Sequence, residues 1–175
     1  MLHRIPELVA PAGSMETLAA AYDRGADGVY VGVGRNNLRA FAPSFTIEQL
    51  PDALTMAHEM NRKLIVVLNS MPNQRQLLEM ESTIKAIGGL KDTPDAVVIS
   101  DPGVLELFRR HAPHIRLHLS TQTGTFNIFS AHFWKSQGIS RIVLPREMSL
   151  SQIQEITAGS DLETEVFVHG ALCVS

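Results

Sequence analysis

The sequence predicts an α/β fold, a (β/α)8 barrel of the TIM type that is incomplete because its last strand is missing. Short apolar runs rich in β-branched residues alternate with longer segments of helical spacing along the whole chain. The apolar runs show little polar alternation, which is typical of parallel strands covered by helices. Seven strands in 175 residues give about 25 residues per repeat, whereas a whole barrel needs ~250. An open doubly wound sheet is the alternative, because it has the same alternation.

The seven predicted strands are short runs dominated by aliphatic side chains, and each is joined to the next through a predicted helix. The strands cover residues 7–11, 27–33, 63–69, 95–100, 116–121, 141–145 and 163–170. The six helices cover residues 14–25, 46–61, 73–89, 103–111, 127–138 and 149–159.

Capping residues support these helix boundaries. Ser149 with Gln152 has the spacing of a capping box, and Asp101 before Pro102 is a favourable helix start. Four glycines stand where helices should end, and we expect left-handed backbone at each of them. They are Gly25, Gly89, Gly138 and Gly159.

Composition limits the classes of protein that the chain can belong to. Hydrophobic residues make up 45% of the chain, enough for a sizeable core. Charged residues make up 19%, the net charge is −3 and no long run of one sign occurs, so no polyanion-binding arm is expected. The apolar runs fall short of the ~18 residues of a membrane helix, and no signal peptide precedes them. We therefore expect a soluble, cytoplasmic protein that does not contact a membrane.

Polar side chains follow the predicted strands at their carboxyl ends, where both barrels and doubly wound sheets place their active sites. The substrate-binding candidates are Arg39, Asn69, Ser120, Gln122 and Arg146. The catalytic candidates at this rim are Glu147, after the sixth strand, and His169, in the seventh. Arg146 and Glu147 have the alternative interpretation of a simple ion pair in a loop.

His118 is a third catalytic candidate. Period-two alternation places Arg116, His118 and Ser120 on one face of the fifth strand, and Leu117 and Leu119 on the other. If the leucines pack against the helices, His118 points into the barrel. The alternative is an interior histidine with satisfied hydrogen bonds and no catalytic role.

Seven segments, in this order, resemble the peptidase U32 family, the collagenase-like proteases. They are ELVAPAGSMETLAAAYDRGADGVYVG, LRAFAPSFT, SDPGVLELF, HLSTQ, FW, RIVLPREMSLSQI and EVFVHGALCVS. The similarity runs from residue 7 to residue 175 and implies that residues 1–175 form a single U32-type barrel domain, truncated within the family signature. One departure is Asn73, where many family members have histidine.

The resemblance is closest to the branch that hydroxylates the wobble uridine of tRNA with prephenate, and other branches act on a ribosomal RNA cytidine or in ubiquinone synthesis. It implies an iron–sulfur cluster in the full-length protein, with Cys173 matching the first of four cysteine ligands. Because the chain has one cysteine, we expect neither cluster nor activity in this fragment. Without the resemblance, Cys173 is more simply interpreted as a small buried hydrophobic residue, which is the usual role of a lone cysteine. Arg39 and Arg146 suit the carboxylates of prephenate.

Two other functions stay open. The first is a collagenase-like, metal-dependent peptidase, although the sequence has neither a recognisable serine–histidine–acid set nor an HExxH motif. The second is a non-catalytic binding module. We expect tRNA or another RNA as partner of the intact protein, and self-association of the fragment through the unpaired edges of its first and last strands.

Overall fold

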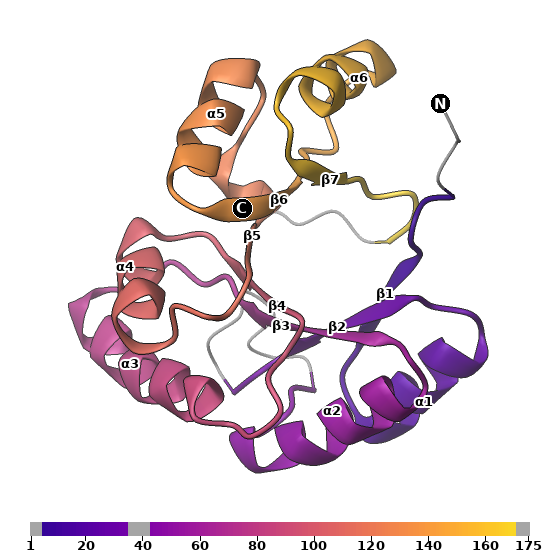
Figure 1. Ribbon diagram of the computed structural model, residues 1–175, viewed down its shortest axis with the longest axis vertical. Helices are drawn as coiled ribbons and strands as arrows, with labels where there is room; N and C mark the ends of the chain where they lie inside the picture. The colour runs from indigo at the N-terminus through magenta and orange to yellow at the C-terminus, as the bar shows by residue number, and fades with distance from the viewer. Residues whose placement is uncertain (1–4, 35–42, 171–175) are drawn as a thin grey trace.

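The computed structural model describes residues 5–34 and 43–170, and it contains one seven-stranded parallel sheet (Figure 1). The strands are β1 (Val9–Ala12), β2 (Gly28–Gly32), β3 (Lys63–Leu68), β4 (Ala96–Ile99), β5 (Leu117–Leu119), β6 (Ile139–Val143) and β7 (Glu163–Glu165). Each strand pairs with its neighbour in sequence, from β1 to β7 in order. The strand order of a doubly wound sheet reverses part-way, whereas this sheet keeps the sequential order throughout, so the sheet is an incomplete barrel.

The helices lie on the outside of the curled sheet, and the strands surround the interior (Figure 1). They are α1 (Met15–Asp23), α2 (Leu50–Glu59), α3 (Gln74–Gly88), α4 (Pro102–His111), α5 (Ile128–Ser136) and α6 (Leu150–Gly159). Two 3-10 turns, η1 (Ile47–Gln49) and η2 (Thr121–Thr123), precede α2 and follow β5. No helix among the described residues is long and apolar enough to cross a membrane.

The predicted helix starts are confirmed. Asp101 Oδ1 accepts a hydrogen bond from Val104 N at 3.0 Å, with proline at the first helical position. Ser149 and Gln152 form a reciprocal capping box. Asn73 caps α3 by accepting from the Gln76 amide at 3.0 Å, so this departure from the family pattern has a local structural role.

The prediction for the glycines is right at two positions and wrong at two. Gly25 and Gly138 have φ of 95° and 83°, the left-handed backbone of a helix end. Gly89 has φ of −91°, and Gly159 is the last residue of α6. A Cβ atom at Gly159 would lie 2.8 Å from Ile128 Cδ1, the end of a flexible side chain, so α5 packs closely against α6 at this glycine.

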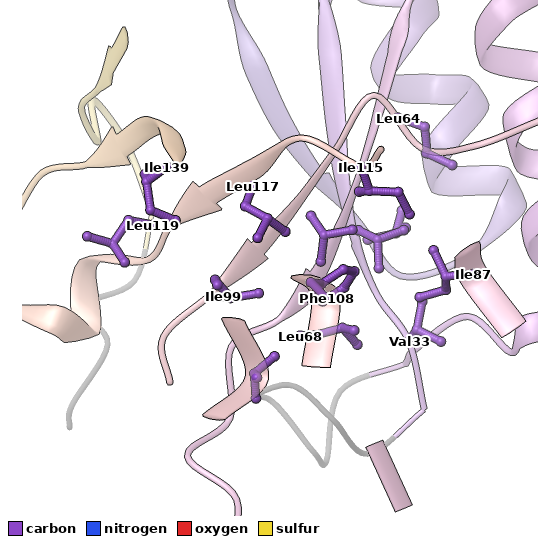
Figure 2. Packing of buried hydrophobic residues seen from close by; sticks show 14 of the residues in the cluster. Val33, Leu64, Leu68, Ile87, Ile99, Phe108, Ile115, Leu117, Leu119 and Ile139 are labelled. Atoms are coloured by element: carbon purple, nitrogen blue, oxygen red, sulfur yellow. The ribbon is translucent and has the colours of Figure 1, made fainter. Parts of the chain in front are cut away.

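The main core lies between the sheet and the helices. Leu64 and Leu68 of β3, Ile99 of β4 and Phe108 of α4 are buried together there (Figure 2). Burying each such side chain contributes ~1.5–3 kcal/mol relative to an exposed one. A smaller cluster of Ile65, Ala96 and Val98 lies on the opposite face of the sheet, inside the barrel, and is packed by Val9, Tyr30 and Val67.

The last strand is shorter than predicted. β7 ends at Glu165, so His169 does not belong to a strand. β6 begins earlier than predicted, and its pairing with β5 shifts register between Leu117 and His118. As a result His118 pairs with Arg141. In the separate pairing of β6 with β7, Arg141 is aligned with Glu163. Three ionisable side chains on adjacent strands therefore face the barrel interior.

Candidate ligand cavity at the carboxyl ends of the strands

A cavity of about 460 Å³ lies inside the barrel and reaches the carboxyl ends of the strands. Its size is within the ~300–1,000 Å³ of typical ligand pockets. Its walls are mostly apolar, and the described lining residues are Val9, Pro11, Ala12, Gly13, Ser14, Thr17, Tyr30, Gly32, Pro43, Ser44, Ile65, Val67, Asn69, Val98, Ser120, Thr121, Gln122, Val143, Glu165 and Phe167. An apolar cavity with a few polar groups suits a small organic ligand.

Strand register brings four polar side chains together at one side of the mouth, and we call them the β3–β5 polar cluster. Leu68 is paired with Ile99, and Ile99 with Leu119, so the next residues along the three strands meet. The cluster consists of Asn69, Ser100, Ser120 and Gln122. Three of the substrate-binding candidates from the sequence thus lie side by side.

Hydrogen bonds hold this cluster in one arrangement. Asn69 Nδ2 donates to Ser120 Oγ at 3.2 Å and to Gln122 Oε1 at 3.1 Å. Ser100 Oγ donates to the Asn69 carbonyl oxygen at 3.1 Å, and Ser120 Oγ donates to Gln122 Oε1. Within the described residues, Gln122 Nε2 makes no hydrogen bond. The amide oxygen of Gln122 is therefore satisfied internally, and its N–H groups are available to a ligand.

Arg146 lies at the rim of the cavity. Its guanidinium carbon lies 3.9 Å from the ring centroid of Phe167, a residue that lines the cavity. Its Nη1 donates to the Gly170 carbonyl oxygen at 3.1 Å. Glu147 and His169 are exposed and are not among the described lining residues. The structure therefore brings Arg146 close to the cavity but does not bring Glu147 or His169 into it.

His118 is buried inside the barrel, on the face opposite Leu117 and Leu119, as the alternation predicts. Its Nδ1 is the one buried side-chain nitrogen or oxygen without a hydrogen bond in the described part of the chain. Burial, together with the positive charge of Arg141, lowers the pKa of His118 to about 3. His118 is therefore a neutral imidazole at pH 7, and it is not among the described residues that line the cavity.

Beside His118 lies an ionic group centred on Arg141, which we call the Arg141 cluster. The guanidinium is 2.7 Å from Glu163 Oε2, 3.0 Å from Glu7 Oε2 and 3.3 Å from Glu165 Oε2. Glu7 precedes β1, so this contact links the first part of the chain to β6 across the interior. Burial raises the pKa of Glu165, against the opposing effect of Arg141.

Arg141 and Glu165 are interior residues that were not predicted from the sequence. The signal was present in ETE and SRIV, where alternation places charged side chains on the same face as an apolar one. Two other candidates, Arg39 and Cys173, lie outside the described residues.

An iron–sulfur cluster requires several converging thiolate ligands. Among residues 5–34 and 43–170, no group of three or more histidine, cysteine or acidic side chains is arranged to hold a metal ion. The described residues therefore do not supply a site for such a cluster.

Sheet order and cavity position together define a β/α-barrel protein whose cavity opens where enzymes of this fold have their active sites. The chain matches peptidase family U32 over residues 13–175, and it belongs to that family.

Named relatives agree with this assignment. The chain is 39% identical to tRNA hydroxylation protein P of Escherichia coli K12 over 171 residues, and this alignment covers 97% of the chain and 37% of that protein. It is 36% identical to the 23S rRNA 5-hydroxycytidine C2501 synthase of the same bacterium, over 99% of this chain and 25% of that protein. The solved structure of the U32 peptidase Mk0906 shares the fold, with a TM-score of 0.73 at 13% identity over 93% of this chain and 68% of that one. The chain thus spans well under half the length of the two Escherichia coli proteins.

Proposed function

We propose that this chain provides the barrel of a protein that hydroxylates the wobble uridine of tRNA. The observation that carries the proposal is the β3–β5 polar cluster, three of whose residues, Asn69, Ser120 and Gln122, line an apolar cavity at the catalytic end of a barrel. The 39% identity to a tRNA hydroxylation protein supports this choice of reaction. A tRNA substrate places the reaction in the cytoplasm.

In this proposal the rim and the cavity have separate tasks. Asn69, Ser120 and Gln122 orient the substrate through amide and hydroxyl groups that are already fixed by hydrogen bonds. Arg146 binds a carboxylate-rich co-substrate such as prephenate, because a guanidinium binds a carboxylate in bidentate fashion. Arg39 is proposed for the same task.

Three residues are proposed to take part in proton transfer. His118 lies within the barrel as a neutral imidazole, whereas Glu147 and His169 lie on the exposed segments that follow β6 and β7. A general base must come within hydrogen-bond reach of the proton that it removes. None of the three is among the described residues that line the cavity, so each needs the bound tRNA, or chain beyond the described residues, to bring it within reach of the substrate.

The proposed iron–sulfur cluster belongs to the intact protein, with Cys173 as one ligand. It would supply redox chemistry, which the described side chains do not provide. The fragment itself is expected to lack both cluster and hydroxylase activity, because four thiolates are needed and the chain has one cysteine.

A graft tests the proposed function. The 175-residue chain replaces the matching segment of the E. coli tRNA hydroxylation protein P in a strain without that protein, and wobble hydroxylation is measured by mass spectrometry of tRNA nucleosides. We expect the graft to restore hydroxylation, and the same graft with Asn69→Ala to lose most of it. Gln152→Ala, a capping change on α6 far from the polar cluster in sequence, is the control. A folded graft without hydroxylation would count against the proposal.

A collagenase-like peptidase is the second candidate, favoured by the shared fold with a protein described as a U32 peptidase. It requires a nucleophile with a base, or a metal with an open position. Cleavage of gelatin by the purified graft, in the presence of added divalent metal and without tRNA hydroxylation, would support it. A graft with neither activity would favour a binding module.

A further inference from the structure

Glu165 is the one charged side chain among the described residues that line the cavity. It lies on β7, in register with Val143 of β6, which also lines the cavity. Its side chain is 22% exposed, so it is neither sealed in the core nor open to bulk solvent. No role for Glu165 was predicted from the sequence.

The two carboxylate oxygens of Glu165 have different surroundings. Oε2 lies 3.3 Å from Arg141 Nη1, which fixes the orientation of the carboxyl group. Oε1 makes no hydrogen bond within the described part of the chain. A carboxyl group can accept a hydrogen bond in either protonation state, so Oε1 offers an acceptor to a ligand.

The remaining surroundings restrict the charge and shape of that ligand. Tyr30 and Phe167 provide aromatic surfaces, and no lysine or arginine is among the described residues that line the cavity. An anion buried against Glu165 would be destabilised by repulsion and by loss of hydration. A flat, neutral ring with both N–H and carbonyl groups is complementary to this cavity, because Glu165 accepts from the N–H and Gln122 Nε2 donates to a carbonyl.

We infer that the cavity takes a pyrimidine base turned out of its nucleic acid strand, and that Glu165 determines specificity by accepting the hydrogen bond of the ring N3–H. Enzymes that act on a base commonly bind it in this way, between apolar surfaces and with hydrogen bonds to its pairing edge. The choice of uracil among pyrimidines rests on the proposed function. The carboxylate-rich co-substrate is then left to Arg146, whose guanidinium carbon lies 3.9 Å from the centroid of the Phe167 ring at the rim.

Nucleoside binding to the full 175-residue chain tests this inference by nuclear magnetic resonance titration. The probes are uridine and 3-methyluridine, which lacks the N3–H group. We expect the wild-type chain to bind uridine about tenfold to a hundredfold more tightly, as for other hydrogen bonds to charged groups. In Glu165→Ala this preference should disappear. Glu165→Gln, which keeps the size of the side chain, should show a smaller preference than the wild type.

Glu163→Ala is the matched control, because Glu163 is also on β7 and also contacts Arg141, but does not line the cavity. It should keep the wild-type preference. Absence of uridine binding, equal binding of the two nucleosides by the wild type, or full preference in a folded Glu165 variant would each overturn the inference. If the 175-residue chain prefers uridine to 3-methyluridine but the graft does not hydroxylate tRNA, only the proposed function would be overturned.

Discussion

Replacement of Arg141 by methionine tests whether the Arg141 cluster stabilises the barrel. The Arg141 side chain is 10% exposed, and its guanidinium contacts three carboxylates at 2.7–3.3 Å. Methionine fills a similar volume without charge, so the change removes the cation and leaves most of the packing.

The magnitude follows from the exposure of the carboxylates. Breaking a buried ion pair by removing one partner costs ~3–5 kcal/mol, and an exposed pair contributes ~0–1 kcal/mol. Glu7 and Glu163 are 39% and 49% exposed, and they keep Lys63 and Arg116 as partners, so they contribute little. Glu165 loses the one cation that contacts it within the described residues. We therefore expect the free energy of unfolding to fall by about 2–4 kcal/mol.

Urea unfolding followed by circular dichroism measures this loss, and the midpoint of thermal unfolding should fall by roughly 5–15 °C. Arg116→Met is the control. Arg116 is 55% exposed and makes one contact, at 3.3 Å with Glu163, so its replacement should cost at most about 1 kcal/mol. Equal stability of Arg141→Met and the wild type would refute the reasoning, because the cluster would then not be stabilising.

Three further predictions concern pH, packing and association. His118 has a pKa of about 3 in the folded chain and ~6.5 in the unfolded chain, so the free energy of unfolding should fall by up to ~1.4 kcal/mol for each pH unit below about 6.5. His118→Leu should flatten this dependence when urea unfolding is compared at pH 7 and pH 5, and an unchanged dependence would contradict the lowered pKa. A Cβ at Gly88 would lie 2.8 Å from Ala112 Cβ, so Gly88→Ala should lower the free energy of unfolding by ~1–3 kcal/mol. Gly28→Ala, where the nearest atom would be 3.5 Å away, should lower it less, and equal losses of stability would show that the contact between α3 and α4 can relax. Val168 is 85% exposed just beyond the edge strand β7, and it should promote self-association of the chain. Val168→Lys should therefore lower the average mass measured by light scattering, and a strictly monomeric wild type at high concentration would disprove the prediction.

The candidate site was predictable where it depends on strand ends. Asn69, Ser120 and Gln122 follow strands that the sequence identifies, and adjacent parallel strands bring such residues to one edge. Their hydrogen bonds were not predictable, because these depend on the register of β3, β4 and β5. The same limit applies to His118. Strand alternation predicts the face of the sheet on which its side chain lies, but the lack of a hydrogen-bond partner for Nδ1 and the lowered pKa depend on its neighbours in space.

The sequence by itself determined the order and type of the elements, because hydrophobic periodicity and capping residues act over a few positions along the chain. It also determined the family, through motifs that are local in sequence. Only the tertiary structure decided between a barrel and a doubly wound sheet, because both have the same alternation and differ in strand order. The charge inside the cavity was likewise decided in three dimensions. The pairing of β6 with β7 aligns Arg141 with Glu163 and brings the Arg141 guanidinium within 3.3 Å of Glu165, which makes Glu165 an interior carboxylate.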